Sequence, residues 1–217
     1  MTNVGFVGLG KLGVPVSCGI ALKGHIVRGY DINPKTCEEL KQGITNLYEP
    51  NLKGQLREVL DNDGFQITDL KTLVDNSVII FVAVPTPSLE NKSFKTTYVK
   101  DAVYSILSAM RPQDNYKVIS VISTVLPTTI RGEIYPIVKE AQNVGKNCGV
   151  CYNAYFIAMG SVVEDFFEPE FVLIGEDGDK AGEILAEFYK TIVPNGVIVT
   201  RGMLLQMKKP YDGTPIL

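Results

Sequence analysis

Short apolar runs alternate along the chain with longer segments in which apolar residues recur at helical spacing. The run SVIIFVAV at 77–84 is apolar almost throughout, which is typical of a central parallel strand buried on both faces. Other strands are expected at 3–7, 26–30, 65–68, 117–122, 149–152, 171–174 and 196–199, and helices at 11–23, 34–42, 52–60, 98–110, 128–143 and 180–189. This alternation predicts an α/β fold, a doubly wound parallel sheet with no complete second domain.

Length and charge narrow the function classes. The 217 residues suffice for one domain with a hydrophobic core. A net charge of −3 gives no basic surface of the kind that nucleic-acid-binding proteins carry. No apolar run approaches the roughly 18 residues that a membrane span needs, and the N-terminus MTNVGFVGLG lacks the features of a signal peptide. We therefore expect no nucleic acid and no membrane among the partners, and a cytoplasmic location.

The cysteines predict no metal site. Cys148 and Cys151 form a lone C-x-x-C pair, whereas a zinc site usually shows a second pair or histidines, and His25 is the only histidine. A redox pair would sit at a helix N-terminus, but this pair falls within an expected strand. Buried or half-buried thiols are favoured over a redox role, and reduced cysteines fit the cytoplasm.

A glycine-rich motif, GLGKLG, follows the first expected strand and begins the first expected helix. Gly8, Gly10 and Gly13 have the G-x-G-x-x-G spacing of the Rossmann dinucleotide fingerprint. Gly8 would permit the tight turn, Gly10 would let the backbone approach the pyrophosphate, and Gly13 would let the helix pack on the strand. Lys11 and Leu12 complete the turn and are expected cofactor-binding residues, since free N–H groups and the helix dipole would meet the phosphates there.

Asp31 lies 18 positions after Gly13, at the end of the expected strand IVRGY. A carboxylate there can accept hydrogen bonds from both hydroxyls of the adenosine ribose, and it would repel the 2′-phosphate of NADP. No arginine follows to neutralise that phosphate, and Arg28 should point elsewhere because it precedes Asp31 by three residues. The motif therefore favours NAD over NADP. The alternative is a structural turn followed by a surface aspartate.

Two further loops follow expected strands at the same edge of the sheet. VPTPS begins with Val84, Pro85 and Thr86, and STVLP spans 123–127. Proline stiffens such loops, and small hydroxyl residues let a ligand come close. Ordinary strand-to-helix turns capped by Ser and Thr would have the same composition. We favour contact with the cofactor because a dinucleotide must cross the sheet at this edge.

Several longer segments carry a family resemblance. They are GLGKLGVP, GYDINP, LYEPNL at 47–52, FVAVPTPS, ISTVLPTTIRGEI and EDFFEPEFVLIG at 164–175. In order and spacing, across residues 3–200, they resemble the N-terminal domain of the nucleotide-sugar 6-dehydrogenases, the UDP-glucose and GDP-mannose dehydrogenase family. LYEPNL and EDFFEPEFVLIG are the specific segments, since generic Rossmann proteins lack them. The expected organisation is a dinucleotide-binding domain at 1–200, followed at 201–217 by a tail or the truncated start of a central helix.

The resemblance implies an oxidoreductase of polysaccharide biosynthesis that oxidises the sugar C6 hydroxyl to a carboxylate with two NAD⁺, through a thioester on a cysteine. The glycine turn, Asp31 and Val84–Thr86 match the NAD site of the family. Thr124 matches a catalytic threonine that orders the reacting groups and contacts the cofactor. A basic residue usually follows the family aspartate by five positions. Here Thr36 occupies that place and Lys35 precedes it, which puts a lysine contact to the ribose in doubt.

The chain departs from the family pattern in two ways. The family usually has Asn-Pro-Glu-Phe-Leu and then Glu-Gly, whereas here Tyr155 and Met159 replace the two glutamates while Asn153, Phe156 and Gly160 keep the frame. Neither replacement is a carboxylate base at neutral pH, since tyrosine has a pKa near 10. Family members also continue into a second domain that holds the catalytic cysteine. None of the four cysteines here is placed to replace that nucleophile.

Three hypotheses stay open. The chain is the NAD-binding half of a nucleotide-sugar dehydrogenase, truncated or split from a second-half chain, or it is a non-catalytic NAD-binding protein that associates with a full-length relative. Less favoured is a β-hydroxyacid dehydrogenase-like enzyme, which would need a lysine on a long downstream helix. Whether the chain is an enzyme is therefore undecided. Alone, it is expected to bind NAD without oxidising a sugar nucleotide, and apolar residues at 203–207 predict a homo-oligomer or a partner chain.

Overall fold

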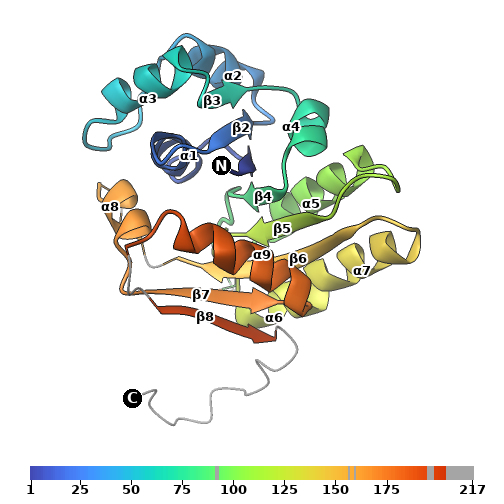
Figure 1. Cartoon of the computed structure of the whole chain (residues 1–217). Coiled ribbons are helices and arrows are strands. Elements are labelled where there is room, and N and C mark those ends of the chain that lie inside the picture. The colour runs from blue at the N-terminus through green and yellow to red at the C-terminus, as the bar shows by residue number, and fades with distance from the viewer. Residues whose placement is uncertain (91–92, 156, 159, 195–197, 204–217) are drawn as a thin grey trace.

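The computed structural model describes residues 1–90, 93–155, 157–158, 160–194 and 198–203. Its centre is a sheet of eight strands in the order β3-β2-β1-β4-β5-β6-β7-β8 (Figure 1). The strands are β1 Asn3–Val7, β2 Ile26–Tyr30, β3 Phe65–Ile67, β4 Ile79–Val82, β5 Lys117–Val121, β6 Cys148–Ala154, β7 Phe171–Glu176 and β8 Ile198–Met203. Neighbouring strands are parallel except β6 and β7, which are antiparallel. The doubly wound, mainly parallel sheet expected from the sequence is confirmed, with this one reversed pairing.

Helices cover both faces of the sheet (Figure 1). They are α1 Gly13–Leu22, α2 Pro34–Lys41, α3 Leu52–Asp61, α4 Leu70–Asn76, α5 Thr97–Ala109, α6 Pro127–Thr129, α7 Tyr135–Asn143, α8 Val162–Phe167 and α9 Asp179–Lys190. Helices α1, α3, α8 and α9 enclose one hydrophobic core, and α4, α5 and α7 enclose the other. Along β4, Ile79 and Phe81 belong to the first core, while Ile80 and Val82 belong to the second. This burial on both faces accounts for the apolar run at 77–84.

Three local features differ from the sequence expectations. Helices α4 and α8 were not expected, although Asp69 caps α4 by accepting the backbone N–H of Thr72 at 2.9 Å. The expected helix at 128–143 is interrupted by a π-helical turn at Ile130–Ile134, between α6 and α7. Strand β8 continues through Met203, so the first residues of the expected tail or helix start are strand. Residues 204–217 lie outside the described residues, and the domain boundary at 200 stays a prediction.

The four cysteines are free, and Cys18, Cys148 and Cys151 are buried. Cys148 and Cys151 lie in β6, and burial raises the pKa of the Cys148 thiol to about 11. The interpretation of this pair as buried thiols is confirmed. Among the described residues, no group of three His, Cys, Asp or Glu side chains is placed to hold a metal ion. None of the described helices is long and apolar enough to cross a membrane.

Candidate cofactor site

The expected cofactor residues meet at the carboxyl ends of β1, β2, β4 and β5. From β1 the chain proceeds to β2 and β3 on one side, whereas β4, β5 and β6 build the other side, so the strand order reverses beside β1 (Figure 1). Ligands of open α/β sheets bind in the crevice at such a reversal. The turn at 8–13 follows β1, Asp31 follows β2, and the loops that begin at Ala83 and Ile122 follow β4 and β5.

The three glycines of the motif differ in what surrounds them. Gly8 has a φ of +101°, and a methyl group on it would lie 2.5 Å from the carbonyl oxygen of Ala83. A methyl group on Gly13 would overlap the carbonyl oxygen of Gly8. By contrast, a methyl group on the exposed Gly10 would meet no heavy atom within 4 Å. The fold therefore requires Gly8 and Gly13, while Gly10 leaves open space above the turn, where backbone could approach a ligand.

The turn ends at the N-terminus of α1, which carries no side-chain cap. Leu12 occupies the N-cap position without a capping hydrogen bond, and the first turn of α1 has no acidic side chain. Intrahelical bonding starts with the Val14 N–H, which donates to the Gly10 carbonyl at 3.2 Å. The exposed Lys11 precedes the half-buried Leu12. An uncapped N-terminus of this kind offers backbone N–H groups and a partial positive charge to an anion.

Asp31 connects the end of β2 to the glycine turn. Its Oδ2 accepts the backbone N–H of Leu9 at 2.8 Å, and its Oδ1 accepts that of Asn33 at 2.9 Å. The half-buried carboxylate is thereby held beside the turn and retains lone pairs for further donors. Arg28 donates to Asn3 Oδ1 at 3.1 Å, which confirms that its guanidinium is directed elsewhere. Lys35 forms an exposed ion pair with Glu39 at 3.7 Å.

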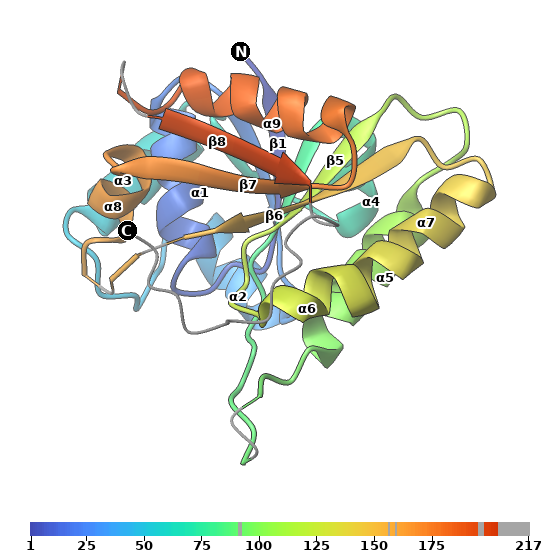
Figure 2. The same cartoon turned by 90° about the horizontal axis from the view of Figure 1, so that it is seen from below.

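The loops after β4 and β5 are in register with the glycine turn. The backbone N–H of Ala83 donates to Val7 O at 2.9 Å, and that of Ile122 donates to Val82 O at 3.0 Å. Within the first loop, Val84 and Thr86 are half-buried and Pro85 is exposed, and in the second loop Thr124 is exposed. Seen from below, the described parts of the loop between β4 and α5 extend away from the sheet (Figure 2).

A side chain that the motif analysis did not single out joins these two loops. Ser123 is 5% exposed, and its hydroxyl donates to the carbonyl oxygen of Val84 at 2.8 Å. The available sequence signal was only a small hydroxyl residue at the end of a buried strand. The expected residues of the glycine turn, Asp31 and both loops therefore lie around one edge of the sheet, and their individual roles stay predictions.

Comparisons with known proteins agree with this geometry. The sequence model described as "UDP-glucose/GDP-mannose dehydrogenase family, NAD binding domain" matches residues 2–193. The chain belongs to this family. The resemblance drawn from the motifs is confirmed, and the matched region is the NAD-binding domain of this family, with NAD as its cofactor.

The relatives of this nucleotide-sugar dehydrogenase domain are longer. GDP-mannose 6-dehydrogenase of Pseudomonas aeruginosa is 27% identical over 193 residues, which are 88% of this chain and 44% of that enzyme. UDP-glucose 6-dehydrogenase AglM of Haloferax volcanii is 28% identical over 88% of this chain and 45% of its own length. A UDP-glucose dehydrogenase from Pyrobaculum islandicum matches in structure with a TM-score of 0.85 and 31% identity, over 94% of this chain and 46% of that one. The chain thus spans about half the length of these relatives.

Tyr155 follows β6, at the position where the family resemblance leads us to expect the first glutamate, and its side chain packs into the protein. Its ring lies 4.9 Å from that of Phe166 and 6.4 Å from that of Tyr189, between centroids. Its hydroxyl oxygen is buried and has no hydrogen-bond partner among the described residues. Tyr155 is therefore part of an aromatic cluster, and its hydroxyl is not available to solvent as an acid or base. Met159, at the second glutamate position, lies outside the described residues.

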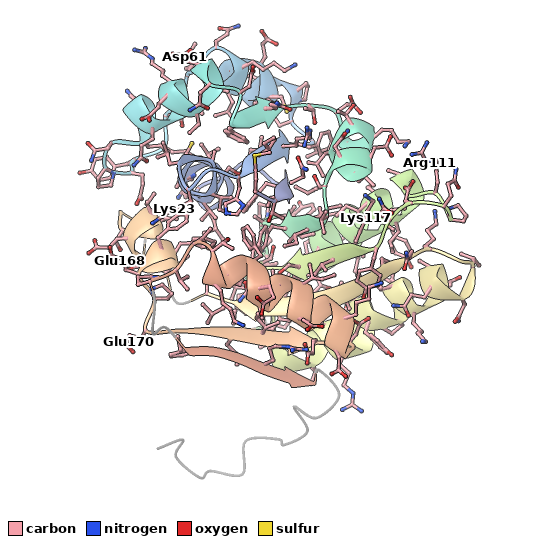
Figure 3. The ribbon with its side chains drawn as sticks, viewed as in Figure 1. Lys23, Asp61, Arg111, Lys117, Glu168 and Glu170 are labelled. Atoms are coloured by element: carbon pink, nitrogen blue, oxygen red, sulfur yellow. The ribbon has the colours of Figure 1, made fainter. Side chains whose placement is uncertain are left out.

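Polar residues around Tyr155 hold the backbone of this corner. Asn153 is 1% exposed, donates to Leu173 O at 2.8 Å, and accepts the hydroxyl proton of Tyr189. Asp165 Oδ2 accepts the backbone N–H of Ala158 and the hydroxyl of Ser161, both at 2.8 Å. A hollow of about 520 Å³ lies beside them, lined in part by Glu168 and Glu170, which Figure 3 places on the side of the molecule away from Arg111 and Lys117. Asn153, Ser161 and Asp165 therefore have a structural role in the described part of this corner.

Proposed function

We propose that this chain binds NAD at the edge formed by the glycine turn, Asp31 and the loops after β4 and β5, and that it prefers NAD to NADP. The observation that carries the proposal is the carboxylate of Asp31, held 2.8 Å from the Leu9 nitrogen, beside a turn whose Gly10 faces open space. Backbone N–H groups at the start of α1 would bind the pyrophosphate. The remaining lone pairs of Asp31 would accept the ribose hydroxyls.

Bound NAD would supply a hydride acceptor, and the residues of the chain would position it. Val84, Pro85 and Thr86 would border the cofactor on one side of the crevice. Thr124, exposed in the next loop, would contact it and order the reacting groups. The turn at 8–13 would hold the phosphates without a side-chain acid, since the first turn of α1 has none.

The first test is a calorimetric titration with NAD⁺ and NADP⁺. Gly10→Ala should abolish binding of both while leaving the unfolding midpoint unchanged, because its methyl group meets only open space in the free protein. Gly54→Ala is the matched control, since a methyl group on Gly54 also meets no atom within 4 Å. Asp31→Ala should reduce the preference for NAD. Equal affinity of the unmodified chain for NADP⁺ would contradict the ribose assignment.

We further propose that the chain alone does not oxidise a nucleotide sugar. Tyr155 is packed among aromatic rings, and Cys18, Cys148 and Cys151 are buried in α1 and β6, where burial raises the thiol pKa. Loss of general acid–base help costs roughly 10²–10⁴ in rate. The test is NADH absorbance after mixing protein, NAD⁺ and UDP-glucose or GDP-mannose. Sustained turnover by the pure chain would contradict the proposal.

Two arrangements would fit such a domain. In the first, the domain works together with a second half that supplies the sugar-nucleotide site, since this chain matches 44% of the GDP-mannose 6-dehydrogenase and 46% of the Pyrobaculum enzyme. In the second, the domain binds NAD without catalysis and associates with a full-length relative. Turnover restored by a cysteine-bearing second-half chain would favour the first.

The association expected from the apolar residues at 203–207 rests on side chains outside the described part of the chain. Free cysteines support a reducing compartment such as the cytoplasm.

A further inference from the structure

We infer that Ser123 is a positioning residue whose hydroxyl holds the loop Val84–Thr86 in the conformation that receives the cofactor. The inference rests on the proposed NAD site and adds to it a residue that does not itself have to touch the ligand. Ser123 follows β5, and its side chain is 5% exposed. Its effect is transmitted through the backbone of the neighbouring loop.

The hydroxyl of Ser123 has two acceptors in reach but only one proton to donate. Val84 O lies 2.8 Å from Oγ and Val82 O lies 3.3 Å from it. Val82 O already accepts the backbone N–H of Ile122 at 3.0 Å. No other donor to Val84 O is found in the part of the chain that the structure describes. The proton is therefore assigned to Val84 O, and the bond fixes the first residue of the loop after Ala83.

Val84 is in turn connected to the glycine turn. A methyl group on Gly8 would lie 2.5 Å from Ala83 O and 3.2 Å from the Val84 nitrogen, so the two backbones are in close contact. The carbonyl oxygen of Gly8 is in turn so near Gly13, at the start of α1, that a methyl group on Gly13 would overlap it. The backbones of Gly8 and of Ala83–Val84 are too close to admit a side chain between them. A displacement of Val84 would therefore change the space beside the glycine turn.

The far end of the same segment is also held by a residue that follows β5. Glu133, in the π-helical turn, accepts the hydroxyl proton of Thr96 at 2.7 Å and pairs with Lys100 at 2.9 Å. The segment between β4 and α5 is therefore attached at its beginning by Ser123 and at its end by Glu133. The contacts of the half-buried Glu133 are the weaker attachment, because ion pairs that solvent can reach contribute little. Ser123 is the buried one.

Removing the hydroxyl should make the loop more mobile and leave NAD to order it. In Ser123→Ala, Val84 O would have to find water, and the loop would occupy the binding conformation for a smaller fraction of the time. The apparent dissociation constant rises in inverse proportion to that fraction. For the loss of one hydrogen bond, NAD affinity should fall roughly threefold to tenfold.

The chain offers a matched control in Ser120, on the same strand. Ser120 is fully buried, and its hydroxyl has no hydrogen-bond partner in the part of the chain that the structure describes, so Ser120→Ala removes a buried hydroxyl without releasing a loop. Both variants are compared with the unmodified chain in three measurements: hydrogen exchange of the Val84 and Thr86 amides in the free protein, NAD⁺ affinity by calorimetry, and the urea unfolding midpoint. Ser123→Thr, which retains the hydroxyl, is the rescue.

We expect faster exchange at Val84 and Thr86 and weaker NAD⁺ binding in Ser123→Ala, neither change in Ser120→Ala, and recovery of both in Ser123→Thr. A lower unfolding midpoint of Ser123→Ala with unchanged loop exchange and affinity would overturn the inference, because it would show only a structural role. Failure of Ser123→Thr to restore them would assign the effect to packing, which also overturns it. If the unmodified chain binds no NAD⁺, the proposed function fails, whereas the exchange measurement still decides whether the hydroxyl holds the loop.

Discussion

Two tyrosines of one aromatic cluster should respond in opposite directions to the same substitution. Tyr155 and Tyr189 both pack against Phe166, with ring centroids 4.9 Å and 6.1 Å from it. The hydroxyl of Tyr155 is buried and has no partner within the described structure, whereas that of Tyr189 donates to Asn153 Oδ1. Replacing either by phenylalanine keeps the ring and removes only the hydroxyl. The pair therefore separates the energy of a hydroxyl from that of ring packing.

The expected magnitudes follow from the cost of burying a polar group. An unsatisfied buried donor or acceptor costs about 1–3 kcal/mol, so Tyr155→Phe should raise the free energy of unfolding by about 1 kcal/mol or more. Tyr189→Phe leaves Asn153 Oδ1 without that donor and should lower it by about 1–3 kcal/mol. Urea denaturation measures both, provided that the slope with denaturant is unchanged between variants. NAD⁺ affinity should be the same in Tyr155→Phe as in the unmodified chain.

Two results would refute this reasoning. A clear loss of stability in Tyr155→Phe would mean that the hydroxyl has a partner, and a change in NAD⁺ affinity would mean that Tyr155 faces the cofactor. The same cluster predicts the fate of the family residue. Tyr155→Glu would place a carboxylate between Phe166 and Tyr189, which costs several kcal/mol unless it is paired. Tyr155→Glu should therefore lower the free energy of unfolding, and we do not expect this substitution alone to restore oxidation of a nucleotide sugar.

Three further outcomes concern other parts of the fold. Burial lowers the pKa of His25 and so favours its neutral form, which means that the free energy of unfolding should decrease as pH falls below about 6.5. His25→Gln should reduce this pH dependence, measured by urea titrations at pH 7.5 and 5.5. In Gly182→Ala the new methyl group would overlap Glu176 Oε2, which is paired with Arg201 at 2.9 Å, so the free energy of unfolding should fall by about 3 kcal/mol or more in chemical denaturation. An unchanged midpoint would show that the ion pair can move aside. Asn51 has a φ of 60°, so Asn51→Ala should be less stable than Asn51→Gly by about 1 kcal/mol in thermal unfolding, and equal stability would contradict the strain.

The elements that sequence analysis placed correctly depend on local chain geometry. The spacing of Gly8, Gly10 and Gly13 requires only a strand, a turn and a helix in succession. The direction of Arg28 away from the edge follows from its distance along β2 to Asp31. The two-sided burial of β4 is visible in its composition alone. In each of these three cases, the predicted structure depends on residues that are close together in the sequence or belong to one strand.

The features that could not be predicted depend on contacts between distant segments. Ser123 and Val84 are 39 residues apart, and no local pattern marks their hydrogen bond. The antiparallel pairing of β7 with β6 depends on the short path through α8, which the sequence analysis had not assigned. Tyr155 occupies the frame position of a glutamate, but its direction is set by Phe166 and by Tyr189, which lies in α9. A motif comparison identifies which residue type replaces the glutamate, but the direction of its side chain depends on packing against distant segments.

The empty space above Gly10 bears on how a mutational scan of this domain would have to be designed. A screen that scores only solubility or resistance to proteolysis would accept a methyl group there, because the free protein offers it more than 4 Å of clearance. The same screen would reject substitutions at Gly8 and Gly13. Scoring one library twice, once for folding and once for capture on an immobilised nucleotide, would therefore separate the residues that shape the chain from those that leave room for its ligand. Substitutions of Gly10 should score well for folding and poorly for capture on the nucleotide.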